Sequence, residues 1–151
     1  PAIQPEVTII HAQIVDTQGT VRIYGQNFGD EQQAKAAKKL IVTCEEIIQS
    51  KKLREFPEHN YIPFFRVNAI VKVPYGAHPY ACYRYYDYDP QFLRLYHEQA
   101  TDDGSFKEFL DEYIYGVNDW EEYLEKIGGE KRLRMLKADK ELGYAPKLKR
   151  S

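Results

Sequence analysis

Apolar residues dominate three segments in the first half of the chain, whereas the second half shows helical periodicity only. These segments cover residues 7–15, 40–44 and 65–73. The first two lack the alternation of a strand with one solvated face, so we expect them to be buried strands of a parallel-type sheet. The third alternates enough to place Arg66, Asn68 and Lys72 on a more polar face. Because three strands make a thin sheet, we expect polypeptide outside this chain to complete it.

The connecting segments predict how these strands pair. Asp16 can accept hydrogen bonds from its own turn and Gly19 can adopt a positive φ, so residues 20–24 should return as the second strand of a hairpin. Residues 31–39 are rich in helix formers, and we predict a helix with Asp30 as its N-cap. A helix followed by a continuous apolar strand is typical of an α/β crossover.

The remaining segments are mostly predicted to be helices. Residues 45–54 are ambiguous and favour a short helix after a turn, whereas residues 74–90 have no regular period. After that loop we expect four helical stretches. They run from Pro90 to Ala100, from a cap at Ser105 to about Tyr115, from a cap at Asn118 or Asp119 to Ile127, and from Glu130 to Lys137.

Size and charge exclude several classes of protein. With 151 residues and a formal net charge of −2, the chain has the length of one domain and no basic surface for nucleic acid. No apolar run approaches the roughly 20 residues that a bilayer requires. Cys44 and Cys82 lie in apolar or aromatic surroundings, which predicts buried thiols in a reducing cytoplasm. The chain opens on Pro1 rather than Met, which favours a fragment or a processed chain.

Self-contained catalytic and metal-binding signatures are absent from the sequence. The four histidines show neither the spacing of a zinc pair nor a Cys-x-x-Cys partner, so we predict no metal site. His11 should be a buried, hydrogen-bonded residue, with Gln13 on the same face of the sheet. Glu45 and Glu46 follow a buried strand at an edge where α/β folds bind ligands, although solvated carboxylates that open a short helix are the simpler interpretation.

A longer and more specific signal lies around residues 73–90. Val73-Pro74-Tyr75-Gly76-Ala77-His78-Pro79, followed by Cys82-Tyr83 and Tyr85-Tyr86-Asp87-Tyr88-Asp89-Pro90, resembles the A subunit of glutaconate-type (class I) coenzyme A transferases. The resemblance extends over nearly the whole chain, through residues 9–13, 41–47, 67–73 and 109–113. It implies an α/β fold of the NagB, ribose-5-phosphate isomerase and CoA-transferase type. Residues 1–151 would then be the C-terminal part of a single A-subunit domain, with strands and the crossover helix in residues 1–88 and a helical region in residues 89–151.

The resemblance also implies an enzyme of two subunits that moves CoA from an acyl-CoA to a carboxylic acid, with glutaconate-like dicarboxylic substrates. A glutamate of the B subunit would carry the acyl group as an anhydride and then CoA as a thioester. No catalytic residue is therefore expected in this chain, and CoA is a substrate rather than a permanently bound cofactor. The implied partners are the N-terminal half of the A subunit and the B subunit. A ring-cleaving CoA-thioester hydrolase of the same fold and a noncatalytic structural piece of the complex remain alternatives.

Position in the implied fold motivates one hypothesis about the site. Two parts of the chain are expected to line or brace the acyl pocket at the subunit interface. They are His11 with Gln13, and the loop formed by Tyr75, Gly76, Ala77, His78 and Pro79.

Overall fold

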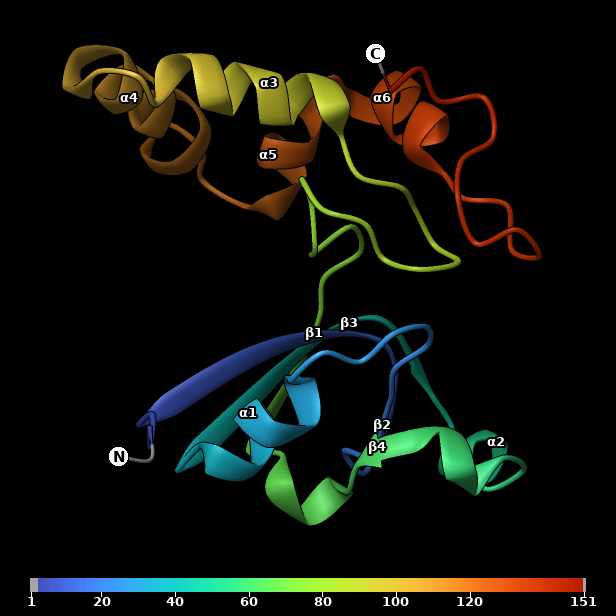
Figure 1. Ribbon diagram of the computed structural model, residues 1–151. Helices are drawn as coiled ribbons and strands as arrows, with labels where there is room; N and C mark the ends of the chain where they lie inside the picture. The colour runs from blue at the N-terminus through green and yellow to red at the C-terminus, as the bar shows by residue number, and fades with distance from the viewer. Residues whose placement is uncertain (1–2, 151) are drawn as a thin grey trace. The chain divides into compact units, whose positions relative to one another are not determined.

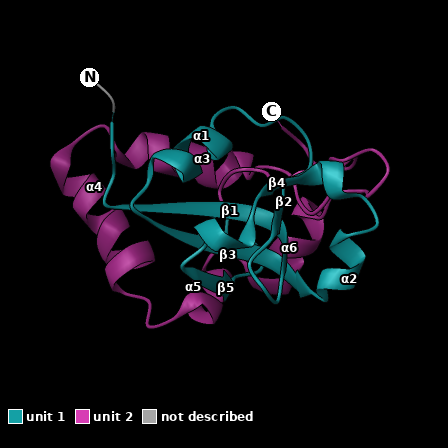
Figure 2. Ribbon diagram, turned by 90° about the horizontal axis from the view of Figure 1, so that it is seen from below, with its two compact units in different colours: residues 1–77 teal, residues 78–151 magenta. Residues whose placement is uncertain are grey.

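The computed structural model describes residues 3–150, which form two compact units (Figures 1 and 2). Unit 1 contains the described residues up to Ala77, and unit 2 contains those from His78 onward. The boundary between the two units falls inside the loop that precedes the helical region. The sequence places the change from strands to helices later, at residue 88. None of the helices within residues 3–150 combines the length and apolar character that a membrane span requires.

Unit 1 is built around a five-stranded sheet of order β4-β2-β1-β3-β5. The strands are β1 (Val7–Asp16), β2 (Val21–Arg22), β3 (Lys39–Ile48), β4 (Asn60–Ile62) and β5 (Ala69–Lys72). Strands β1, β3 and β5 pair in parallel, whereas β2 and β4 are antiparallel additions at one side. The predicted hairpin and the parallel crossover are therefore confirmed, and β4 is an edge strand that the sequence pattern did not reveal.

The predicted turn between β1 and β2 depends on Asp16 and Gly19. Oδ1 of Asp16 accepts hydrogen bonds from the backbone N–H groups of Gln18, Gly19 and Thr20 at 2.9, 2.8 and 2.9 Å. Burial alone would raise the pKa of Asp16, but these hydrogen bonds and one from the side chain of Ser50 outweigh it and lower the pKa below its ordinary value. Gly19 has a φ of 107°, which a residue with a Cβ rarely adopts.

The crossover helix α1 (Asp30–Ala36) begins one residue earlier than predicted. Gly29 is its N-cap, and Asp30 lies instead in the first turn, where a negative charge interacts favourably with the helix dipole. A second helix, α2, is limited to Ser50–Leu53. Short 3-10 turns at Pro57–His59 and Phe64–Arg66 complete the unit, so the strand predicted from residue 65 begins only at Ala69.

Strand β3 continues four residues beyond its predicted end at Cys44. Val15 and Asp16 of β1 pair with Ile47 and Ile48, so the parallel ladder holds this segment extended. The predicted helix over residues 45–54 is therefore wrong at its start, because ladder pairing overrides a weak local preference for helix. As a result Glu45 lies within the sheet.

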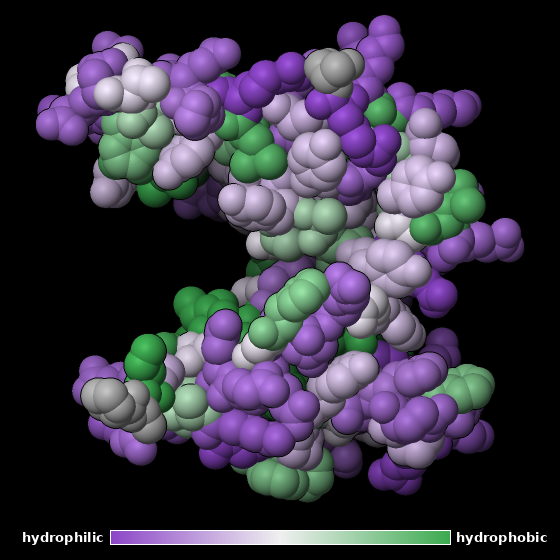
Figure 3. All heavy atoms as spheres, in the orientation of Figure 1, coloured by the Kyte–Doolittle hydropathy of each residue, from purple (hydrophilic) through white to green (hydrophobic). Residues whose placement is uncertain are grey.

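The two faces of the sheet differ in their burial. The core is a cluster of buried apolar side chains that includes Ala34 of α1, together with Ile10, Ala12, Val15, Val21, Ile23, Leu40, Val42, Cys44 and Ile62. By contrast, Val7, Ile9 and Val71 have exposed fractions of 50%, 65% and 46%. Figure 3 shows apolar residues reaching the surface of this unit. An exposed apolar sheet surface is one that additional polypeptide can cover.

Unit 2 is helical, as predicted. Its helices are α3 (Pro90–Gln99), α4 (Asp103–Leu110), α5 (Trp120–Lys126) and α6 (Gly129–Leu136), with a π-helical turn (Asp111–Tyr115) after α4. Aspartates at 89, 102 and 119 cap α3, α4 and α5 by accepting backbone N–H hydrogen bonds. The cap of α4 was predicted at Ser105, but Asp102 performs it because its carboxylate reaches two free N–H groups.

Candidate functional site

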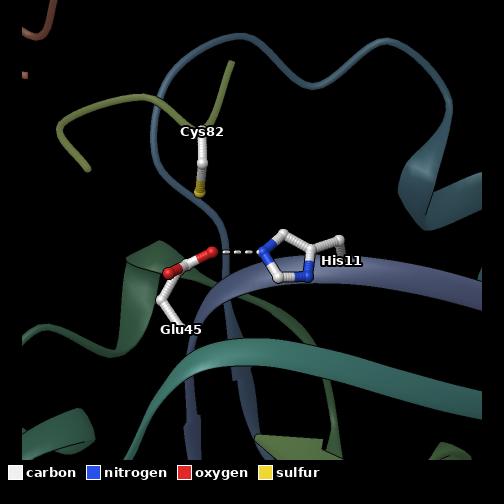
Figure 4. A group of neighbouring side chains, drawn as sticks. All are labelled: His11, Glu45 and Cys82. Atoms are coloured by element: carbon white, nitrogen blue, oxygen red, sulfur yellow. Dashed lines mark hydrogen bonds and ion pairs between the residues drawn. The ribbon is translucent and has the colours of Figure 1, made fainter. Parts of the chain in front are cut away.

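His11 and Glu45 form a close pair on the sheet of unit 1 (Figure 4). Nε2 of His11 lies 2.7 Å from Oε1 of Glu45, and Nδ1 lies 2.8 Å from Oγ1 of Thr43. The pairing follows from the sheet register, since His11 of β1 stands opposite Thr43 of β3 and Glu45 is two residues further along the same face. Both ring nitrogens are engaged, so the orientation of the imidazole is fixed.

The backbone after β5 packs against this pair. The N–H of Tyr75 donates to Oε2 of Glu45 at 2.9 Å. Tyr75 has a φ of 61°, an uncommon conformation for a residue with a side chain and one that concentrates at functional sites. Burial, followed by the charge of Glu45, raises the pKa of the Tyr75 hydroxyl. The carboxylate is thus held from two sides, by a ring on β1 and by a backbone amide of the loop.

The arrangement of His11 and Glu45 is better suited to proton transfer than to nucleophilic attack. An imidazole oriented by a carboxylate is a common general acid or base, and it can also hold a hydrogen-bonded ligand in place. Glu45 is 6% exposed and both of its oxygens are engaged, so its geometry favours orienting His11. The neighbouring Cys44 stays a thiol at neutral pH, because burial raises its pKa to about 11.

Replacing Gly76 with alanine should perturb this pair. A Cβ at Gly76 would lie 2.7 Å from Cε1 of His11 and 2.8 Å from the carbonyl oxygen of Val73, so the ring or the loop must move. We expect a lower Tm than that of the wild type. Gly29→Ala is the matched control, because its Cβ would meet only the end of the Gln33 side chain at 3.6 Å. Equal Tm values for the two variants would show that the close approach is not tight.

Other residues of the predicted site have different partners. The amide of Gln13 donates to the carbonyl of Tyr24 at 3.2 Å and accepts from its N–H at 3.1 Å, which ties β1 to the chain after β2. Ala77 ends unit 1 and is partly buried. Within unit 1 the structure therefore brings His11 together with Tyr75 and Gly76.

His78 and Pro79 belong to unit 2, where His78 is part of a buried network. Nδ1 of His78 lies 2.6 Å from the hydroxyl of Tyr123, and Nε2 lies 3.3 Å from Oδ2 of Asp89. With its proton on Nε2, the ring donates to the carboxylate and accepts from the hydroxyl. Arg132 donates to both oxygens of Asp89, through Nε at 2.8 Å and through a terminal nitrogen. The network braces unit 2 from within.

The sequence pattern missed Glu45 and Arg132. Glu45 was interpreted as a solvated carboxylate of a short helix, whereas it is buried in a strand. Its position two residues after Thr43, in a strand parallel to that of His11, is the signal that could have found it. Arg132 has no comparable signal, because 43 residues separate it from Asp89 along the chain.

Comparison with known proteins is consistent with this architecture. Residues 1–73 match the family described as Coenzyme A transferase. Over 144 residues the chain is 46% identical to the A subunit of glutaconate CoA-transferase from Acidaminococcus fermentans, a match that covers 95% of this chain and 45% of its relative. Superposition on the crystal structure of glutaconate coenzyme A-transferase from the same organism gives a TM-score of 0.90 over 96% of this chain and 45% of that one.

Two further relatives are named for different reactions. The chain is 36% identical over 127 residues to the A subunit of 3-oxoadipate CoA-transferase from Pseudomonas knackmussii, covering 84% of this chain and 44% of its relative. It is 27% identical over 120 residues to the cholesterol ring-cleaving hydrolase IpdA subunit of Mycobacterium tuberculosis, covering 78% and 41%.

By sequence and by fold, this chain is similar to the coenzyme A transferases, and the predicted α/β CoA-transferase fold is confirmed. Within that class it resembles the glutaconate-type A subunit, as its motifs predict. The chain spans less than half the length of the curated relatives that it matches.

Proposed function

We propose that this chain is part of the A subunit of a two-subunit CoA-transferase that moves CoA from an acyl-CoA to a carboxylic acid. The observation that carries the proposal is the 46% identity, with a TM-score of 0.90, to glutaconate CoA-transferase over nearly the whole chain. The name of that relative supports small dicarboxylic substrates. Coenzyme A is a substrate here, and the proposal involves no permanently bound cofactor. Cys44 and Cys82 are buried and are not joined in a disulfide, which agrees with a reducing cytoplasm as its location.

The proposed reaction uses a glutamate of the companion B subunit. Its carboxylate attacks the thioester carbonyl and expels the CoA thiolate, which gives an acyl anhydride. The thiolate then attacks the glutamyl carbonyl of the anhydride, releases the first acid and leaves a glutamyl-CoA thioester. The acceptor carboxylate attacks the carbonyl of this thioester and expels the CoA thiolate, which gives a new anhydride. The thiolate then attacks the acyl carbonyl of that anhydride, which forms the new acyl-CoA and frees the glutamate.

The residues of this chain would line or brace the acyl pocket. His11, held by Glu45 and Thr43, presents a fixed polar ring at the sheet surface, and the Tyr75-Gly76 backbone closes over it. Fixed polar groups of this kind can hold a carboxylate or meet a developing oxyanion. We assign the bracing role to Gln13, Ala77, His78 and Pro79.

The proposed partners are the N-terminal half of the A subunit and the B subunit. The matched relatives extend well beyond this chain, and each of the two CoA-transferase relatives is named as the A subunit of its enzyme. The sheet face that exposes Ile9 and Val71 offers apolar surface for the rest of the A subunit to cover.

Product analysis of the natural assembly tests the reaction class. Native mass spectrometry first identifies the chains that copurify, and the assembly is then given glutaconyl-CoA and acetate. We expect acetyl-CoA and free glutaconate with no net release of thiol. Free CoA thiol without acetyl-CoA would indicate the hydrolase, which the IpdA relative supports as the second candidate. An assembly that is inert in both assays would identify the chain as a structural piece.

A further inference from the structure

Unit 2 contains an aromatic pocket next to His78, and its tyrosine, phenylalanine and tryptophan side chains have no role in the proposed reaction. Its volume is about 620 Å³, and its lining includes Tyr80, Phe92, Tyr96, Tyr113, Trp120 and Tyr123. We infer that this pocket is the docking site for a segment of the companion subunit, one that presents large apolar side chains flanked by lysine or arginine. The identity of the companion rests on the proposed function.

The floor of the pocket is preformed. His78 packs edge-on against Phe92 with ring centroids 4.9 Å apart, and it is held from behind by Tyr123 and Asp89. Trp120 stacks on Tyr123 at 4.8 Å. Because these rings are fixed by one another and by a buried hydrogen-bonded network, a partner would enter the pocket without reordering it.

The rim suits a protein surface rather than a small molecule. Tyr80, Tyr96 and Ile114 line the pocket and have exposed fractions of 66%, 45% and 53%, and the adjacent Tyr115 is 74% exposed. Exposed tyrosine around a tryptophan-containing hollow is the composition of an interface centre. Tyr115, the residue after Ile114, adds a further exposed aromatic side chain, and the end of unit 2 that carries α4 shows hydrophobic residues among hydrophilic ones (Figure 3).

The charges around the pocket indicate which residues should flank the apolar side chains of the partner segment. The segment from residue 102 to residue 125, which supplies the second half of the pocket, contains a single basic residue, Lys107. Its acidic residues are Asp102, Asp103, Glu108, Asp111, Glu112, Asp119, Glu121, Glu122 and Glu125. All of them except Glu122 are exposed, and Asp119 lines the pocket itself. These acidic residues would attract a basic partner segment and repel an acidic one.

A companion chain fits this surface better than the rest of the same subunit does. The pocket has an aromatic centre, and the segment that supplies its second half carries exposed acidic residues. An apolar centre with polar surroundings is typical of an interface between separate chains. The exposed sheet face of unit 1 differs, because it is an apolar face of a largely parallel sheet. Such sheets are covered on both faces, which favours cover by further segments of the same polypeptide.

Hydrogen-exchange mass spectrometry of the natural assembly and of the separated A polypeptide tests the inference. We expect peptides over residues 113–123 to exchange more slowly in the assembly. Ile114→Lys should weaken assembly at least tenfold. Glu121→Lys should also weaken assembly, and its effect should be larger at low salt than at high salt. Leu142→Lys is the matched control, since Leu142 is 52% exposed in the same unit but does not line the pocket. Circular dichroism checks that each variant is folded.

Two results would overturn the inference. One is unchanged exchange over residues 113–123 together with normal assembly of Ile114→Lys. The other is protection of this segment by glutaconyl-CoA alone, which would make the pocket a small-molecule site. The proposed function fails separately, because an assembly that protects the pocket but transfers no CoA refutes only the reaction. An active assembly with an unprotected pocket refutes only the docking site.

Discussion

Replacing Asp89 with alanine should destabilise the protein by about 3–5 kcal/mol, because it removes one partner from a buried ion pair. The residue is 1% exposed. Its carboxylate accepts hydrogen bonds from Arg132 and His78, and it also caps α3 by accepting from the N–H groups of Gln91 and Phe92 at 3.0 and 2.9 Å. Alanine leaves the guanidinium of Arg132 buried without a counter-charge and removes the cap at the same time.

Urea unfolding of matched variants separates the two contributions. Asp102→Ala removes an exposed cap with the same hydrogen-bond pattern, so its loss should be much smaller. Adding Arg132→Met to Asp89→Ala should recover part of the loss, since the unpaired cation is then gone. If Asp89→Ala were no more destabilising than Asp102→Ala, the buried pair would contribute nothing beyond capping.

The same network gives a dependence of stability on pH. Burial acts to raise the pKa of Asp89, but the hydrogen bonds from Arg132 and His78 outweigh it and hold the pKa well below its ordinary value. A lowered folded-state pKa contributes stability that is fully present above the unfolded value of about 3.9 and is lost as the pH falls below it. The difference in Tm between the wild type and Asp89→Asn should therefore shrink in acid. A constant difference would contradict this linkage.

Most of the fold follows from patterns within short stretches of sequence. Local sequence predicts the strands β1 and β3 from their continuous apolar runs, and the turn between β1 and β2 from Asp16 and Gly19. This works because burial and turn chemistry act locally. The errors arise where distant pairing decides. Residues 45–48 join β3 through contacts with β1, and Asn60–Ile62 becomes β4 only by pairing with β2. Neither pairing can be predicted from the pattern of the neighbouring residues.

The candidate site was predicted less completely, because its chemistry depends on parallel register. His11 could be interpreted as a hydrogen-bonded strand residue from its surroundings alone. Its carboxylate partner could not be identified until β3 was known to extend through Glu45 beside β1. The resemblance indicated the Tyr75-Gly76 backbone, and the structure gives a physical reason for it, since a larger residue at Gly76 would collide with the His11 ring.

Glu45→Gln in the natural assembly should lower kcat by about 10²-fold if Glu45 positions His11 for the proposed reaction, because misplacement of a polar group by about 1 Å has that effect. Glutamine keeps an oxygen that can accept from the N–H of Tyr75, so the loop should remain in place. It loses the negative charge that orients the imidazole. Steady-state kinetics with glutaconyl-CoA and acetate measures the effect, and KM for the acyl-CoA should change little, since glutamine has nearly the same size and shape as glutamate.

The neighbouring Glu46 provides the control. It is exposed and its side chain points to the opposite face of β3, so Glu46→Gln should keep the wild-type kcat. Equal Tm values for the two variants would exclude loss of folding as the cause of any difference in kcat. A wild-type kcat for Glu45→Gln would remove the pair from the reaction and leave it as a brace between β1 and β3. A loss confined to Glu45→Gln would instead place the sheet surface of this chain beside the reacting acyl group, although the proposed nucleophile belongs to the companion subunit.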